Sequence, residues 1–258
     1  MTATPVIREN IPAYLAELRQ WLKETKDVPL EDMDGFFTAR LERYEEHMAV
    51  WDKAYDRAAA LLPEGCGPLL DLGCGTGLEL DRIFARWPEL CVTGIDLCAA
   101  MLEKLRAQHA GRSLTLQCAD YLTAELGEAR YGAVLSVQSL HHFTPAQKGA
   151  LYRRIYHALR PGGVFLEADY IACCGEEETM LREECARRRA RDGVPAETFV
   201  HFDTPLTLPH ELALLQEAGF PACEAVDSIA GAVLVRAVKP SVSYAESTPI
   251  LSKRGGKP

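Results

Sequence analysis

Short apolar runs alternate with amphipathic stretches through the middle of the chain. Strands buried on both faces read as near-continuous apolar runs, and the stretches between them have the period of helices. The strands expected from this pattern are Leu69–Asp71, Cys91–Asp96, Leu114–Cys118, Tyr131–Val137 and Val164–Asp169. The helices expected between them are Leu78–Arg86, Ala99–Gln108 and Pro145–Leu159.

The C-terminal part predicts a helix over Pro209–Ala218 and two strands, Cys223–Ile229 and Ala232–Val238, joined in a hairpin at Gly231. Together the elements predict an α/β fold with a doubly wound, seven-stranded sheet. The sheet is mostly parallel and ends in an antiparallel C-terminal hairpin. Right-handed crossovers in such a sheet place ligands at the carboxyl ends of the strands.

Two amphipathic helices are expected before the sheet, over Ile11–Lys26 and Phe36–Leu62. One face of the second helix carries a stripe at helical spacing, made of Tyr44, His47, Met48 and Trp51. The stripe either packs the helix onto the sheet or forms a lid over a ligand pocket. In the second case Tyr44 and His47 supply polar contacts.

Residues 175–192 are strongly charged and predict a helix inserted after the fifth strand. The basic cluster Arg187–Arg191 is typical of a solvated, salt-bridged helix face. The alternative is a cationic wall for an anionic substrate. The expected organisation is an N-terminal helical extension or lid (1–62), a ligand-binding core (63–170), a helical and loop cap insert (171–207), the C-terminal part of the core (208–239) and a flexible tail (240–258).

Composition narrows the class of protein. The 258 residues are 48% hydrophobic and 25% charged, which is typical of a globular chain with a real core. The N-terminus resembles no signal peptide and no apolar run approaches the ~18 residues of a membrane span, so a cytoplasmic protein without membrane partners is expected. The net charge of −9 argues against long nucleic acid as a partner. Nine scattered cysteines without a C-x-x-C pair predict neither disulfides nor structural zinc.

Three glycines follow the first strand at alternate positions, Gly73, Gly75 and Gly77. Glycine allows positive φ and a close approach of backbone to a ligand, and the following helix N-terminus presents free N–H groups. A dinucleotide fingerprint needs its last glycine three positions after the second, and a P-loop needs Gly-Lys-Ser/Thr; neither is present. Asp71 would repel a pyrophosphate but could accept hydrogen bonds from a cationic amine.

The segment Leu69–Gly77 resembles the first motif of class I S-adenosylmethionine-dependent methyltransferases. The resemblance continues in order through Gly94-Ile-Asp96, Ala119-Asp120, His141-His-Phe143 and Pro161-Gly-Gly163. It covers residues 69–170 and implies a Rossmann-like sheet that binds S-adenosylmethionine. Gln138-Ser139-Leu140 stands where the amide and adenine-amine methylators of the family carry an Asn/Asp-Pro-Pro-aromatic motif, so the resemblance favours the small-molecule type.

The resemblance also implies roles for individual residues. Asp71 would hold the ammonium side of the cofactor, Asp96 both ribose hydroxyls, and Asp120 the adenine amine. An ionised carboxylate suits these roles because it is acceptor-only and can take two donors. The full set of cofactor-binding residues expected is Tyr44, Asp71, Gly73, Cys74, Gly75, Asp96, Leu97, Met101, Asp120, Tyr121 and Gln138.

Methyl transfer from a sulfonium is a direct displacement that mainly needs alignment and exclusion of water. The catalytic candidates are His141 and His142, which follow the fourth strand and could either act as a base or support the loop. Side chains of adjacent residues are expected to diverge, so a shared metal is not expected and the transfer is taken as metal-independent. The candidates for binding the substrate are His47, Asp169, Tyr170 and His201.

Three functions are consistent with the sequence. The first is methyl transfer to a small-molecule acceptor. The second is a tRNA-wobble-uridine modification enzyme resembling carboxy-S-adenosylmethionine synthase, in which Arg187–Arg191 would bind a carboxylate. The third is a non-catalytic S-adenosylmethionine-binding protein, which a wide, open pocket at Gln138 would favour. The sequence leaves the oligomeric state open, a homodimer included, and does not identify the accepting atom.

Overall fold

A seven-stranded sheet with the order β3-β2-β1-β4-β5-β7-β6 forms the centre of the protein. The computed structural model describes residues 7–195 and 197–241, so most of the tail expected at 240–258 lies outside the described residues. The first five strands pair in parallel, and β7 is antiparallel to both β5 and β6, as the hydrophobic pattern predicts. The strands are β1 Leu69–Leu72, β2 Val92–Asp96, β3 Leu114–Cys118, β4 Tyr131–Val137, β5 Leu159–Tyr170, β6 Ala222–Ile229 and β7 Ala232–Val238.

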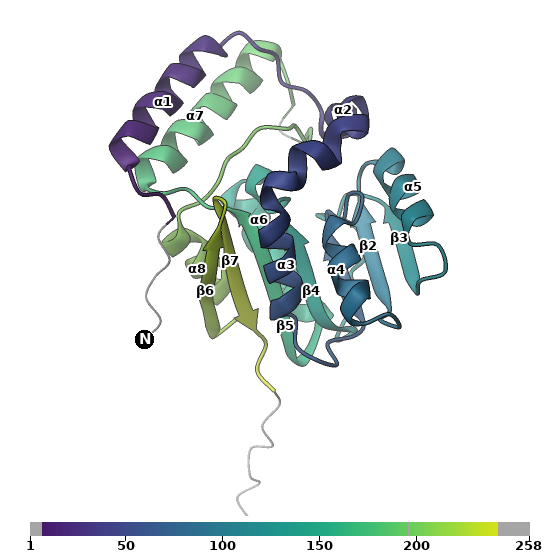
Figure 1. Ribbon diagram of the computed structural model, residues 1–258. Coiled ribbons are helices and arrows are strands. Elements are labelled where there is room, and N and C mark those ends of the chain that lie inside the picture. The colour runs from purple at the N-terminus through teal and green to yellow at the C-terminus, as the bar shows by residue number, and fades with distance from the viewer. Residues whose placement is uncertain (1–6, 196, 242–258) are drawn as a thin grey trace, which may run out of the picture.

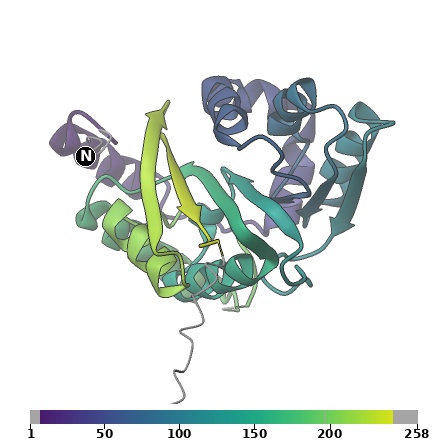
Figure 2. The same cartoon turned by 90° about the horizontal axis from the view of Figure 1, so that it is seen from below.

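Helices cover both faces of the sheet (Figures 1 and 2). They are α1 Ile11–Glu24, α2 Met33–Met48, α3 Asp52–Leu61, α4 Leu78–Arg86, α5 Ala99–Gln108, α6 Pro145–Ala158, α7 Gly175–Asp192 and α8 Leu208–Glu217. Alternation along β1 sends Leu70 and Leu72 into the core under α6 and α8, and Leu69 into the core under α3, α4 and α5. Because both faces are covered, every residue of β1 is buried.

A second layer of helices lies beyond the sheet. Figure 1 shows α1 and α7 side by side at one end of the molecule. Leu15, Leu18 and Leu22 of α1 pack with Leu181 of α7 and with Phe202 of the segment that follows. Within the described chain, no helix is both long and apolar enough to span a bilayer.

The expected single helix over 36–62 is wrong. The chain forms α2, then a 3₁₀ turn over Ala49–Trp51, then α3. The helix also begins earlier than expected, because Asp32 is its N-cap and accepts from Gly35 N at 2.9 Å. The break lets α3 pack on the sheet while α2 crosses its carboxyl edge. A smaller difference is that β5 begins at Leu159 rather than Val164, with a register shift against β4.

A fully buried ion network joins α6, β5 and α8. Lys148 is 3.2 Å from Glu167 and 2.7 Å from Glu211, and all three side chains are fully buried. The Tyr152 hydroxyl contacts both carboxylates and can donate its single proton to either one. Burial raises the pKa of Glu167 to about 7 although Lys148 opposes the shift. The Lys148 ammonium group is therefore the counter-charge of two buried carboxylates.

We expect Lys148→Met to lower the free energy of unfolding by about 3–5 kcal/mol, because it leaves buried carboxylates without a counter-charge. Urea denaturation at neutral pH measures the loss. The control combines Lys148→Met with Glu167→Gln and Glu211→Gln, and this triple variant should recover much of the stability. A loss for the single variant no larger than the roughly 1 kcal/mol of an exposed pair would contradict the expectation.

Candidate functional site

The sheet has its topological switch point between β1 and β4. These strands are neighbours, but the chain continues from β1 toward β2 and β3 on one side and from β4 toward β5 on the other. Ligands of doubly wound sheets bind in the crevice that this reversal leaves at the carboxyl ends of the strands. Here the crevice lies between the glycine loop after β1 and the loop 138–143 after β4.

The glycine loop leaves no room for a side chain at Gly73, and its backbone conformation disfavours one at Gly75. Gly73 has φ +73°, and a Cβ there would lie 2.0 Å from the Ser139 hydroxyl oxygen. Gly75 has φ +47°, and a Cβ there would lie 3.5 Å from the Tyr44 hydroxyl of α2. The loop is fixed by bonds from Gly73 N to the Ile95 carbonyl and from Gly77 N to the Cys74 carbonyl, each 2.8 Å.

Asp96 closes β2 and orders the same loop. One carboxylate oxygen accepts from Gly75 N at 2.9 Å and the other from Cys98 N at 2.8 Å. Burial raises the pKa of Asp96, although these N–H groups oppose the shift. The carboxylate keeps further lone pairs that can accept from hydroxyl groups.

Asp71 and Glu79 form a buried acidic pair beneath the loop. Both oxygens of Asp71 and one of Glu79 have no hydrogen-bond partner among the described residues. Burial, and then the neighbouring Glu79, raise the pKa of Asp71 well above its usual value, and burial raises that of Glu79 to about 7. Orphaned buried carboxylates are costly, so this arrangement fits a cationic group of a ligand.

A narrow crevice of about 40 Å³ lies over the glycine loop, under α2. Of the cofactor-binding residues expected from the sequence, those that line it are Tyr44, Gly73, Gly75, Asp96, Leu97, Met101, Tyr121 and Gln138. Asp71, Cys74 and Asp120 do not line it; Asp120 instead accepts from Leu122 N at 2.8 Å.

Further residues that line this crevice are not among those expected from the sequence: Met33, Asp34, Phe37, Ser139 and Phe199. Phe37 had a signal, because it precedes Tyr44 by seven residues and so shares its helix face.

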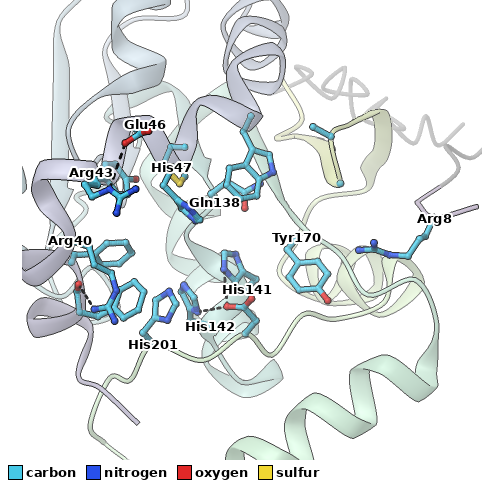
Figure 3. Close-up of a pocket in the computed structure, with 18 residues that line it drawn as sticks. Arg8, Arg40, Arg43, Glu46, His47, Gln138, His141, His142, Tyr170 and His201 are labelled. Atoms are coloured by element: carbon cyan, nitrogen blue, oxygen red, sulfur yellow. Dashed lines mark hydrogen bonds and ion pairs between the residues drawn. The ribbon is translucent and has the colours of Figure 1, made fainter. Parts of the chain in front are cut away.

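A cavity of about 1000 Å³ adjoins the crevice (Figure 3). It contains five of the residues predicted to act in catalysis or to bind the substrate, His47, His141, His142, Tyr170 and His201. Its further polar lining is Arg8, Arg40, Arg43, Glu46 and Asp203, which the sequence analysis did not single out. Four side chains line both the crevice and the cavity: Phe37, Tyr44, Gln138 and His142. These four mark the place where two ligands would meet.

The paired histidines are held by a buried carboxylate. Asp169 bonds to Nδ1 of His141 and accepts from the backbone N–H groups of Leu140 at 2.7 Å and His141 at 3.1 Å. Asp169 is fully buried and does not line the cavity, which its predicted substrate contact would require. The expectation that the histidine side chains diverge is wrong: a 3₁₀ turn over Leu140–His142 places their ring centroids 4.0 Å apart.

Asp203 reaches the same histidines from the cap. Its carboxylate oxygen is 3.5 Å from His141 Nε2 and 3.4 Å from His142 Nδ1. Burial would lower the pKa of His141, but Asp169 and Asp203 outweigh it and raise the pKa to about 10. Burial, and then the charge on His141, lower the pKa of His142 to about 3. His201 lies beside them, with its ring stacked on Phe36.

The basic cluster Arg187–Arg191 makes contacts that hold neighbouring segments together. Arg187 and Arg191 donate to the Lys26 carbonyl after α1, and Arg189 donates to the carbonyls of Pro195 and Thr198. None of these arginines lines the cavity. The cationic wall that the sequence offered as an alternative is therefore not at this site.

Other arginines do face the cavity. Arg40 pairs with Glu31 at 2.8 Å and lies 3.7 Å from the centre of the Phe36 ring. Arg8 lies 3.6 Å from the centre of the Tyr14 ring, and its buried Nε has no partner among the described residues. Figure 3 shows Arg8 directed toward Tyr170.

Strand order, glycine loop and strand-end carboxylates together define an S-adenosylmethionine-binding fold of the methyltransferase type. Residues 69–163 match the family model described as "Methyltransferase domain". This segment is a class I S-adenosylmethionine-dependent methyltransferase domain, which confirms the resemblance seen in the sequence. The buried acidic pair and Asp96 fit that cationic, ribose-bearing cofactor.

Comparisons with individual proteins agree with this assignment. An uncharacterized methyltransferase of Mycobacterium bovis is 32% identical over 112 residues, which are 43% of this chain and 55% of that protein. The chain thus spans about half the length of such curated relatives. A carboxy-S-adenosyl-L-methionine synthase of Wolinella succinogenes is 28% identical over 61% of this chain and 66% of that protein. Human N-acetylserotonin methyltransferase, solved in complex with SAM, shares the fold with a TM-score of 0.58 and 20% identity, covering 89% of this chain and 66% of that one.

We expect the free energy of unfolding to depend on pH through the buried Glu79. Its folded pKa of about 7 lies above the usual 4.5, so between these pH values the unfolded chain releases the proton first and unfolding is favoured. Relative to Glu79→Gln, the wild type should lose up to about 3 kcal/mol as the pH rises through this window, and nothing further above it. Urea denaturation of both proteins across the pH range measures the difference. A difference that does not change with pH would contradict the raised pKa.

Proposed function

We propose that the chain transfers a methyl group from S-adenosylmethionine to a small-molecule acceptor by direct displacement. The observation that carries this proposal is the meeting of two cavities. The crevice over the glycine loop carries residues suited to the cofactor and would have to widen from about 40 Å³ to admit it. The cavity of about 1000 Å³ has the size of a small-molecule pocket. Gln138 and His142 stand at their junction, where the transfer would occur.

The bound cofactor would supply a methyl group already activated by its sulfonium charge. The protein would hold the cofactor and the acceptor, align them for the transfer, and exclude water. Asp71 and Glu79 would attract the ammonium group, and Asp96 would accept from the ribose hydroxyls. Helix α2 covers the crevice through Phe37 and Tyr44, which would keep water from the junction.

The acceptor would be selected by the cap, which we assign to the N-terminal helices (1–62) and to residues 171–207. Aromatic side chains and the arginines of the cavity favour a planar or anionic acceptor. His142 would contact the acceptor because it lines both cavities. His141 would act as a positioning residue, since the buried Asp169 holds its Nδ1.

A second candidate is carboxylation of the cofactor itself. Relatives named carboxy-S-adenosyl-L-methionine synthase align over longer parts of the chain than the M. bovis methyltransferase does. In that case the cavity would hold a carboxylate donor against Arg8 or Arg40, instead of the Arg187–Arg191 cluster. The product would be the cofactor heavier by one CO₂, which mass spectrometry separates from methyl transfer.

We expect Asp96→Ala to weaken S-adenosylmethionine binding by about 1–3 kcal/mol, because ribose hydroxyls and two loop N–H groups lose their acceptor. Calorimetric titration measures this as a roughly 5- to 150-fold higher Kd. Asp120→Ala is the matched control and should bind as the wild type does, since Asp120 lies outside the crevice. Equal losses in both variants would instead support the adenine contact that the sequence implies for Asp120.

Incubation with methyl-labelled S-adenosylmethionine and a metabolite extract should yield a labelled product and the demethylated cofactor. His142→Ala should bind the cofactor normally and lose most turnover, because its side chain lies where the acceptor must stand. His157→Ala, an exposed histidine of α6, serves as control. Cofactor binding without any product, labelled or carboxylated, would favour the non-catalytic function.

A further inference from the structure

We propose that His141, His142 and Asp203 bind a divalent transition metal ion, with zinc as the best match, on the wall of the large cavity. One nitrogen from each histidine and one carboxylate oxygen lie within 4.8 Å of one another. Two imidazoles and a carboxylate are a common donor set for zinc and iron. The proposal replaces the sequence-based expectation of a metal-free site, which rested on divergent histidine side chains.

The spacing of the donor atoms favours an ion over direct hydrogen bonds. One Asp203 carboxylate oxygen lies 3.5 Å from His141 Nε2 and 3.4 Å from His142 Nδ1, and this Nδ1 also lies 3.3 Å from the Phe202 carbonyl oxygen. Charge-assisted bonds from imidazolium to carboxylate are much shorter, about 2.7–2.9 Å. Tetrahedral zinc holds its ligands at about 2.0–2.2 Å, which places neighbouring donor atoms roughly 3.3–3.6 Å apart. The two separations from Asp203 are in this range, and the two histidine nitrogens lie within 4.8 Å of each other, so an ion would draw them closer together.

The hydrogen bonding of His141 is typical of a metal-binding histidine. Its Nδ1 is bonded to the buried Asp169, so Nε2 is left to face Asp203 and the cavity. Metal-binding histidines usually give their other ring nitrogen to a carboxylate in this way, which fixes ring orientation and raises ligand basicity. Asp169 is itself fixed by the Leu140 and Tyr170 N–H groups at 2.7 and 2.8 Å.

The charges around His141 also favour a bound metal ion. Asp169 and Asp203 both face His141, and together they carry more negative charge than a single imidazolium can balance. The nearest other imidazole, His201, stacks on Phe36 and is not part of the donor set. A divalent ion between His141, His142 and Asp203 would balance the two carboxylates.

The position would let the ion act on the acceptor, and this part rests on the proposed function. Three protein ligands leave a fourth position open, as in catalytic zinc sites, and all three residues line the cavity. A hydroxyl or thiol held there loses its proton to water more readily. The resulting anion forms a bond to the methyl carbon while the carbon–sulfur bond of the sulfonium breaks, which leaves a neutral thioether. The inferred acceptors are thus alcohols, phenols and thiols.

Cobalt titration of the chelator-treated full chain tests the site without reference to activity. We expect one equivalent of Co²⁺ with the visible bands of tetrahedral coordination, displaced by Zn²⁺. Asp203→Asn and His142→Gln should abolish these bands, and Asp169→Asn should weaken binding by about 10–100-fold while leaving the ligand set intact. His47→Gln, which lines the same cavity outside the donor set, should bind as the wild type does.

Absence of Co²⁺ and Zn²⁺ binding by the wild type would overturn the proposal, as would equal binding by wild type and Asp203→Asn. Circular dichroism of each variant separates lost binding from lost folding. Calorimetry with S-adenosylmethionine on the metal-free protein keeps the two proposals apart. Cofactor binding and methyl transfer that persist where no metal binds would reject the metal site and retain the proposed function.

Discussion

A single buried carboxylate organises the site. Asp169, at the end of β5, bonds to His141 and accepts from the backbone N–H groups of Leu140, His141 and Tyr170. These bonds tie the loop after β4 to the neighbouring strand at the switch point of the sheet. Because that loop carries Gln138 and His142, the boundary between the two cavities is set by this one group. Its full burial makes each bond costly to lose.

The cap depends on that loop in turn. Thr204 N donates to the His141 carbonyl at 2.7 Å, and His201 N donates to the Glu31 carbonyl at 3.0 Å. The segment after α7 therefore connects the histidine loop to the residues that precede α2. The histidine loop, the cap and the start of the helix that covers the crevice are thus joined by backbone hydrogen bonds.

Local patterns made much of the fold predictable. Strands buried on both faces and the glycine loop can each be recognised within a few residues, and the alternation of strands and helices predicts the doubly wound sheet. The site was less predictable because its walls come from distant segments. Asp203 meets His141 across 62 positions, and the adjacent histidines converge only because of a 3₁₀ turn. For Arg187–Arg191 the predicted salt-bridged helix face is confirmed, because Arg187 and Arg188 pair with Glu184 and Arg191 pairs with Asp192. The contacts of Arg187 and Arg191 with the Lys26 carbonyl could not be predicted, because they join distant segments.

The two cavities also differ in their electrostatics. Under the glycine loop, Asp71, Glu79 and Asp96 gather three carboxylates within a buried region, and their raised pKa values express the cost of that charge. Arginine side chains face the other cavity, with Arg8 lacking a partner for its buried Nε among the described residues. A cationic cofactor relieves the first region and an anionic acceptor the second. This difference in charge supports the proposal that the cofactor binds at the crevice and the acceptor in the wide cavity.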